Sequence, residues 1–186
     1  MPQGLTTVFT ESGKPFELET LPTPDIEPGG ILINNTDAVI CGSDLHVWRG
    51  DGDGPKVSKR RVLGHEFTGV VHSLGKGIDT DSLRRPLKEG DRVAFPFFFP
   101  CHHCYHCIRG EHHACTFRMR RNMVGLDAYP YCNGGMAEYF YLQPTHYAYK
   151  VPDELPSQAI PAVNCALAQV LFGLERVGVA FGDTVV

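Results

Sequence analysis

The chain has 186 residues, of which 42% are hydrophobic and 20% are charged, a balance that indicates a globular protein. A net charge of −4 argues against nucleic acid as a partner, because that binding depends on cationic contacts to phosphate. No apolar stretch approaches the roughly 18 residues of a membrane-spanning helix, and the first residues lack the basic and apolar regions of a signal peptide. We therefore expect no membrane partner and a reducing, cytoplasmic compartment.

Short segments with the composition of β-strands alternate with turn residues through most of the chain. They are residues 31–33, 67–74, 91–97, 136–142 and 147–151, with Gly or Pro at or near their ends. Strands of this length between such turn residues predict a mainly β fold, either a twisted antiparallel sheet or a partly open antiparallel β-barrel.

The sequence changes character after Pro152, where helical patterns replace strand patterns. Residues 153–160 predict a short helical turn, and a longer helix is expected to begin near Pro161, whose missing N–H costs little in a first turn. Apolar residues at i, i+3, i+4 and i+7 give this helix one apolar face: Leu167, Val170, Leu171 and Leu174. Gly178 is expected to end it, and residues 182–186 are typical of a turn that enters a strand.

Four of the seven cysteines form a C-x2-C-x2-C-x7-C pattern: Cys101, Cys104, Cys107 and Cys115. Thiolates at this spacing can close a tetrahedron around one Zn²⁺, and four sulfur ligands leave no open position for catalysis. We therefore predict a structural zinc ion whose binding stabilises the loop. A disulfide scaffold would leave one of the seven thiols unpaired, and the bacterial iron–sulfur pattern needs a final gap of three residues followed by proline.

Several histidines lie among these cysteines and offer substitute ligands. We interpret them instead as solvent-facing loop residues: His102, His103, His106, His112 and His113.

A second group of metal-ligand candidates is spread over three distant segments. These are Cys41-Gly42-Ser43-Asp44-Leu45-His46, Gly64-His65-Glu66 and Asn164-Cys165. Taken alone, each residue is weak evidence, because a single cysteine or histidine more often packs in a core. If Cys41, His65 and Cys165 meet, they provide the two sulfurs and one nitrogen of a catalytic zinc site with an open fourth position. Nothing local establishes that they meet.

Several segments together resemble the zinc-dependent medium-chain dehydrogenase/reductase family, the zinc alcohol dehydrogenases. The matching motifs are Cys41-Gly-Ser-Asp-x-His46, Gly64-His65-Glu66-x-x-Gly69, Gly90-Asp91-Arg92-Val93, the cysteine quartet and Asn133-Gly134-Gly135-Met136-Ala137-Glu138. The resemblance implies a GroES-like catalytic domain over residues 1–152, with a zinc lobe at about 96–120. Residues 153–186 would then hold linking helices and the first strand of a nucleotide-binding domain.

The resemblance also implies roles for the residues of the second group. Cys41, His65 and Cys165 would hold a catalytic zinc, with water or the substrate oxygen as the fourth ligand. Glu66 would lie beside the metal and approach it transiently. The position of Cys165 is Asp or Glu in some relatives, so cysteine here places the chain nearer the alcohol dehydrogenases than the sorbitol-type enzymes.

Catalysis in such a site requires removal of a proton as well as of a hydride. Zinc polarises the alcohol oxygen, and the resulting alkoxide gives hydride to nicotinamide. The family's proton relay would run from Ser43 through the coenzyme ribose to His46. Asp44 would orient a neighbouring ligand or relay group, although Ser43 and Asp44 also fit ordinary turn chemistry. Trp48 and Phe98 resemble pocket-lining positions and fit a barrel core equally well.

The expected function is therefore oxidation of a small alcohol to an aldehyde or ketone with NAD(P)⁺. The coenzyme-binding fingerprint G-x-G-x-x-G is absent from the 186 residues, so we expect a catalytic domain that is inactive without a nucleotide-binding partner. NAD or NADP would bind only with that partner, and the full-length form is expected to be a homo-oligomer. Two alternatives stay open: a non-catalytic zinc-stabilised binding module, and a zinc enzyme that acts without nicotinamide.

Overall fold

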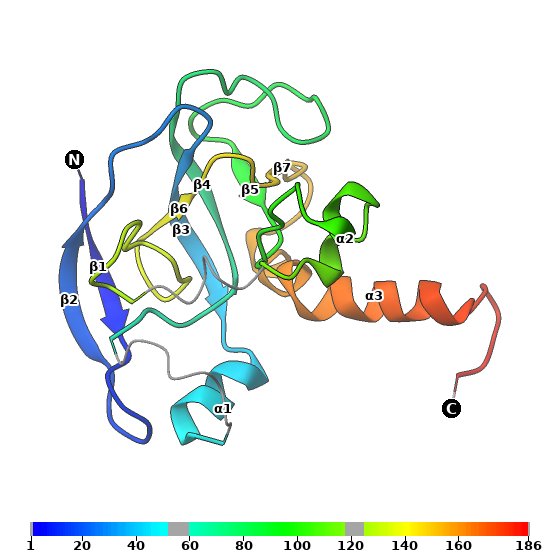
Figure 1. Ribbon diagram of the computed structural model, residues 1–186, viewed down its shortest axis with the longest axis horizontal. Coiled ribbons are helices and arrows are strands. Elements are labelled where there is room, and N and C mark those ends of the chain that lie inside the picture. Colours follow the sequence, from blue (N-terminus) through cyan, green and yellow to red (C-terminus); the bar gives the residue numbers. More distant parts are fainter. Residues whose placement is uncertain (1, 52–59, 118–124, 186) are drawn as a thin grey trace.

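The computed structural model describes residues 2–51, 60–117 and 125–185. In this part of the chain, two antiparallel sheets form the body of the molecule (Figure 1). The smaller sheet is a hairpin of β1 (Gln3–Val8) and β2 (Glu17–Pro22). The larger has the order β6-β3-β4-β5-β7, with β3 (Ile31–Val39), β4 (Glu66–Leu74), β5 (Arg92–Ala94), β6 (Tyr139–Leu142) and β7 (Tyr149–Lys150). The predicted mainly β, open antiparallel architecture is confirmed.

The strands differ from the sequence prediction in length and number. The hairpin β1–β2 was not predicted. The segments predicted as strands at 91–97, 136–142 and 147–151 contain only the shorter β5, β6 and β7. Pro96 explains the early end of β5, because it has no N–H to donate to a neighbouring strand. Residues 136–138 pair with β1 instead of continuing β6: Thr7 N–H donates to the Met136 carbonyl at 2.9 Å, and Glu138 N–H donates to the Leu5 carbonyl at 2.9 Å. This segment joins the two sheets.

The main core lies against one face of the larger sheet and is rich in phenylalanine. The Phe67 ring meets Phe95 and Phe140 edge-on, with ring centroids 5.0 and 4.9 Å apart. Phe95 and Phe140 stack with centroids 5.3 Å apart. Ile31 and Ile33 alternate along β3 to reach the same cluster, as the two-residue period of a strand requires. Of these side chains, Phe67, Phe95 and Phe140 also line the pocket of the site described below.

Helix α1 (Gly42–Arg49) follows β3 directly and was not predicted. It begins after Cys41, and the carboxylate of Asp44 accepts the N–H of Cys41 at 3.0 Å, which satisfies a main-chain donor before the first turn. Gly50 ends the helix with φ of 78°, a left-handed conformation that glycine adopts at low cost. Cys41 and Asp44 are therefore fixed at the start of a helix.

The predicted helix after Pro161 is split into two parts. Its two parts are a short 3₁₀ segment, η3 (Pro161–Asn164), and the helix α3 (Ala166–Val177). Another 3₁₀ segment, η2 (Ser157–Ala159), lies within residues 153–160, where a short helical turn was predicted. The break falls at Cys165, whose φ and ψ of −133° and −76° are not helical. Gly178 ends α3 with φ of 73°, as predicted.

Helix α3 leads away from the sheets, and the chain ends beyond it (Figure 1). Its predicted apolar face is exposed: Leu167, Val170 and Leu171 have relative exposures of 45, 58 and 57%. The strand expected after Gly182 is not formed, since residues 182–185 are irregular and pair with no strand of the described chain. A strand needs a hydrogen-bonded neighbour, which the described residues do not provide there.

A small lobe projects from the larger sheet between β5 and β6. It contains α2 (Tyr105–Ile108) and η1 (His112–Ala114). The zinc lobe predicted at about 96–120 is described as far as Phe117, and its last positions lie outside the described residues.

No single helix among the described residues is long and apolar enough to cross a membrane. The bent pair Ser157–Asn164 and Ala166–Val177, with 56° between its parts, meets those criteria only when both parts are counted together.

Candidate metal centres

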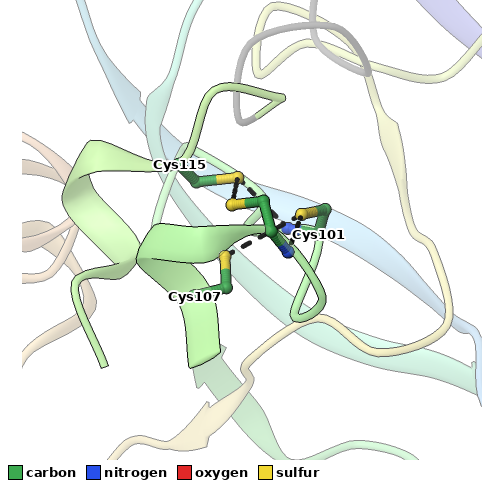
Figure 2. A group of neighbouring side chains, drawn as sticks. Cys101, Cys107 and Cys115 are labelled. Atoms are coloured by element: carbon green, nitrogen blue, oxygen red, sulfur yellow. Dashed lines mark hydrogen bonds between the residues drawn. The ribbon is translucent and has the colours of Figure 1, made fainter. Parts of the chain in front are cut away.

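The four cysteines of the lobe lie around one point. One ligand atom from each of Cys101, Cys104, Cys107 and Cys115 lies within 4.8 Å of all the others, and the labelled sulfurs in Figure 2 turn toward one another. Two sulfur–sulfur distances, Cys101–Cys107 and Cys104–Cys115, are both 3.9 Å. Sulfurs bound to zinc at about 2.3 Å in a tetrahedron stand about 3.8 Å apart, so this donor set fits a tetrahedral zinc ion.

The thiols of the quartet differ in how readily each loses its proton. Main-chain and thiol hydrogen bonds, the largest from Cys107, lower the pKa of Cys104 to about 6. Burial and the neighbouring thiols raise the pKa of Cys107 to about 12. The N–H of Cys101 points to the Cys115 sulfur at 3.4 Å, and that of Cys104 to the Cys101 sulfur at 3.3 Å. Such N–H groups stabilise sulfur in its anionic form, which is the form that binds metal.

The histidines of the lobe lie outside this cluster, and three of them are not simply solvent-facing. The ring of His102 bonds to the Thr145 carbonyl at 2.9 Å, and His112 bonds to the Tyr147 hydroxyl at 3.2 Å. His106 pairs with Glu111 at 2.9 Å. Two of these contacts attach the lobe to the chain just before β7. The expectation holds only for His103 and His113, which are exposed.

The second group of candidate ligands also comes together, although its members are far apart in sequence. Cys41, His65, Glu66 and Cys165 each place a ligand atom within 4.8 Å of the others. Cys41 precedes α1, His65 and Glu66 stand at the start of β4, and Cys165 occupies the break before α3. Thiolate, imidazole and carboxylate are the donors that zinc takes in proteins, so this set fits a zinc ion as well.

Asp44 fixes the position of His65 through contacts with its ring and with the preceding residue. Its Oδ1 lies 3.5 Å from Nδ1 of His65 and also accepts the N–H of Gly64 at 3.2 Å. Gly64 has φ of 88°, a left-handed conformation that favours glycine, and it turns the chain so that His65 faces the site. The other ring nitrogen of His65, Nε2, lies 3.4 Å from the hydroxyl of Ser43.

The contact between Asp44 and His65 favours the charged form of each side chain. The hydrogen bond to Asp44 raises the pKa of His65 despite burial. Burial opposes ionisation of Asp44, but bonds from His65 and from the N–H groups of Cys41 and Gly64 outweigh it and lower its pKa. Asp44 is therefore an anion that can orient a neutral or protonated imidazole.

The two sulfurs of the second group differ in their environment. Burial, followed by the neighbouring Cys41 and Glu66, raises the pKa of Cys165 to about 12. Burial also acts on Cys41, but hydrogen bonds with Ser43 and His65 outweigh it and lower the pKa of that thiol. Glu66 itself is buried and accepts the N–H of Ala166 at 3.1 Å, which ties the start of β4 to the start of α3.

A pocket of about 510 Å³ opens beside this second group. It is lined by Cys41, Ser43, His65 and Cys165 and by a wall of aromatic side chains that includes Phe95, Phe97, Phe99 and Phe140. Neither Trp48 nor Phe98 belongs to its lining. The indole N–H of Trp48 instead donates to the Lys14 carbonyl at 2.9 Å, which joins α1 to the β1–β2 turn. The pocket is mainly apolar, and its polar lining includes Arg61 and Asn133 as well as the candidate ligands.

His46 lies at the surface rather than in this pocket. Its side chain is 68% exposed and its Nδ1 is 3.3 Å from Asp51. Ser43 and His46 both belong to α1, and no hydrogen bond joins them in the described structure.

Sequence reasoning missed two side chains beside Cys165. Asn164 was noted only as its neighbour, and its amide donates to the Phe67 carbonyl at 2.5 Å. Gln169 was not considered, yet its amide nitrogen lies 2.8 Å from the Cys165 sulfur and it lines the pocket. The i, i+4 spacing of Gln169 from Cys165 is a signal that could have found it.

Known proteins share this sequence pattern and fold. The alcohol dehydrogenase GroES-like domain family matches residues 27–153. The chain is 32% identical over 179 residues to 5-exo-hydroxycamphor dehydrogenase from Pseudomonas putida, which covers 89% of this chain and 45% of that protein. An alcohol dehydrogenase from Thermotoga maritima superimposes with a TM-score of 0.85 and 25% identity, over 97% of this chain and 49% of that one. The acetophenone reductase of Geotrichum candidum, solved in complex with NAD, gives 0.75 and 26%, over 96% and 49%.

The chain thus has the catalytic-domain fold of a dehydrogenase. It belongs to the zinc-type alcohol dehydrogenase family, through the GroES-like domain of that family. The predicted resemblance is confirmed. The chain spans about half the length of the relatives it matches.

Proposed function

We propose that this protein supplies the catalytic domain of a zinc-dependent dehydrogenase that interconverts a small alcohol and an aldehyde or ketone with NAD(P). The observation that carries the proposal is the convergence of Cys41, His65, Glu66 and Cys165 beside a mainly apolar pocket. A structural zinc site is closed by four protein ligands, as in the lobe, whereas a catalytic zinc has three protein ligands and an open position that faces a pocket.

The two donor sets would hold two metal ions with different roles. Cys101, Cys104, Cys107 and Cys115 would hold a structural zinc. Cys41, His65 and Cys165 would hold a catalytic zinc, with Glu66 next to it. A bound zinc ion acts as a Lewis acid that polarises the oxygen of an alcohol or carbonyl. Zinc has no redox chemistry of its own, so the hydride needs an acceptor, and NAD(P) is the one that the family implies.

The side chains around the pocket have separate tasks in this scheme. The hydroxyl of Ser43, at hydrogen-bonding distance from His65, takes the proton of the substrate hydroxyl. His46 receives it at the surface beside Asp51 and releases it to solvent. Because no bond joins Ser43 to His46, the relay needs a hydroxyl between them, which the coenzyme ribose would provide. Phe97, with its ring centroid 5.1 Å from that of His65, helps to keep water from the reacting atoms.

The coenzyme would be held by a part of the full-length protein that lies beyond these 186 residues. We propose that this part covers the exposed apolar face of α3, formed by Leu167, Val170 and Leu171 on the helix that begins directly after Cys165. We also propose that the full-length form is a homo-oligomer. A reducing, cytoplasmic compartment belongs to the same proposal, because both metal sites need thiols that are not oxidised to disulfides.

The metal content of three proteins tests the proposal. The wild type is expected to bind two zinc ions per chain and the Cys41→Ala variant one. Cys132→Ala is the matched control, because Cys132 is buried but belongs to neither donor set, and this variant should keep both ions. Equal zinc in wild type and Cys41→Ala would contradict the catalytic site and support a non-catalytic, zinc-stabilised module. Turnover of an alcohol or carbonyl substrate by the full-length protein without NAD(P) would support a zinc enzyme of another kind.

A further inference from the structure

Cys165 differs from the other candidate ligands in how it is held. It occupies a break between two helical segments, where its own φ and ψ are not helical. Its position is therefore set by the residues on either side of it. Asn164 ties the segment to β4 through its 2.5 Å bond to the Phe67 carbonyl, and Asn164 itself is 4% exposed. Phe67 directly follows Glu66 in β4, so this bond holds the start of α3 close to that candidate ligand.

Gln169 contacts Cys165 twice, once through the main chain and once through the side chain. Its N–H donates to the Cys165 carbonyl at 3.0 Å, which begins the hydrogen-bond ladder of α3. Its side-chain amide nitrogen lies 2.8 Å from the Cys165 sulfur. An amide N–H group can only donate, and a thiolate is a far better acceptor than a thiol. The contact is therefore suited to the metal-binding form of Cys165.

The surroundings of Cys165 otherwise offer little support for negative charge. The residue is 7% exposed, and both Cys41 and Glu66 lie close to it. Among the described residues, no lysine or arginine forms an ion pair with Glu66, and the cationic groups beside the cluster are the imidazole of His65 within it and Arg61 in the lining of the pocket. The amide of Gln169 is a side-chain donor in direct contact with the Cys165 sulfur.

We propose that Gln169 is a positioning residue of this metal site, acting through the Cys165 sulfur. Its N–H holds the sulfur in one rotamer and withdraws electron density from it, so that Cys165 donates less charge to a bound metal. A metal bound by Cys165 would then be a stronger Lewis acid toward the substrate oxygen. The inference rests on the proposed function, because it assumes that Cys165 is a ligand.

A purely structural role would make a different prediction. If the Gln169 side chain only lies across the helix surface, its loss would leave the metal unaffected. Gln169 is exposed, so its replacement opens no cavity and the fold should tolerate Gln169→Met and Gln169→Leu, neither of which has an N–H to donate. Gln158 is also exposed and lies in η2, away from both donor sets, so Gln158→Met is the matched control.

Cobalt(II) reports directly on the metal–sulfur bonds. The purified protein is loaded with Co²⁺ and the sulfur-to-cobalt charge-transfer band is recorded, and the rate of zinc release to a chelator is measured on zinc-loaded samples. Without this N–H, Cys165 donates more charge to cobalt, so we expect Gln169→Met and Gln169→Leu to shift the band to longer wavelength. The Cys165 side chain also loses the contact that holds its rotamer, so we expect it to leave the metal more often and one of two zinc ions to be released about tenfold faster, while Gln158→Met matches the wild type. Unchanged spectra and release rates in both Gln169 variants would overturn the inference. Uptake of only one metal ion by the wild type would instead overturn the proposed function, and the inference with it.

Discussion

Asp44 Oδ1 and His65 Nδ1 lie 3.5 Å apart, although the two residues come from different elements, α1 and the start of β4. The same carboxylate accepts the N–H groups of Cys41 and Gly64. One buried side chain thus fixes two candidate ligands, Cys41 and His65, relative to each other. Its loss should therefore affect metal binding as well as the stability of the fold.

The Asp44→Asn variant tests this relationship. The amide keeps the size of the side chain but removes its charge and one acceptor. We expect zinc affinity at the second site to fall by about 10- to 100-fold and the free energy of unfolding to fall by about 1–3 kcal/mol. Competition with a chelator and chemical denaturation measure the two effects. Asp51→Asn, beside the exposed His46, is the control and should change neither, and equal behaviour of the two variants would refute the positioning role.

The lobe should depend on its four thiols for order. In Cys104→Ser, one sulfur of the quartet is replaced by a hydroxyl that binds zinc poorly, and metal binding contributes directly to the folding of such loops. We expect faster amide hydrogen exchange over residues 101–117, with the protection of β3 and β4 retained. Exchange in Cys132→Ser should match the wild type. Wild-type protection of the lobe in Cys104→Ser would show that the bonds of His102 and His112 to the segment before β7 are sufficient.

The aromatic wall has a role in stability as well as in the pocket. Phe140 is 4% exposed and contacts Phe67 and Phe95, and all three line the pocket. Phe140→Ala should lower the free energy of unfolding by about 3–5 kcal/mol, because it removes buried area and leaves a cavity. Tyr105→Ala, at a site that is 65% exposed, should change it by less than about 0.5 kcal/mol. Urea denaturation distinguishes them, and a small effect at Phe140 would contradict the packing described.

Acid stability should depend on Asp81. Burial opposes its ionisation, but Arg85 and the N–H groups of Lys150, Arg85 and Leu83 lower its pKa from 3.8 to about 2. A carboxyl with a depressed pKa in the folded state stabilises the protein above the unfolded pKa and loses this contribution as pH falls through the folded value. The wild type should therefore exceed Asp81→Asn in stability above pH 4, with the difference shrinking toward pH 2. A difference independent of pH, or one that grows in acid, would be inconsistent with this assignment.

Local spacing carried much of what could be predicted from the sequence. The quartet from Cys101 to Cys115 lies within one short loop, so its spacing alone indicates that the sulfurs can meet. Gly178 as the end of α3 and the long strand β4 are local features of the same kind. The hairpin β1–β2 was missed although Gly13 and Pro15 lie between its strands, because both strands mix polar and apolar side chains.

The second site depends on contacts that spacing does not contain. Cys41 and Cys165 are 124 positions apart, so only their family resemblance suggested that they meet. Helix α1 was missed because the acceptor that caps it, Asp44, was assigned to turn or relay chemistry. The break at Cys165 was missed for a tertiary reason, since the bond from Asn164 to Phe67 separates η3 from α3.

The most direct test of the second metal site is a crystal of the zinc-loaded protein with anomalous scattering recorded at the zinc absorption edge. The account predicts two peaks per chain. One lies about 2.3 Å from the four sulfurs of the lobe, and the other is bonded to Cys41, His65 and Cys165 at the edge of the pocket. A single peak in the lobe, with those three side chains ordered and pointing apart, would contradict it.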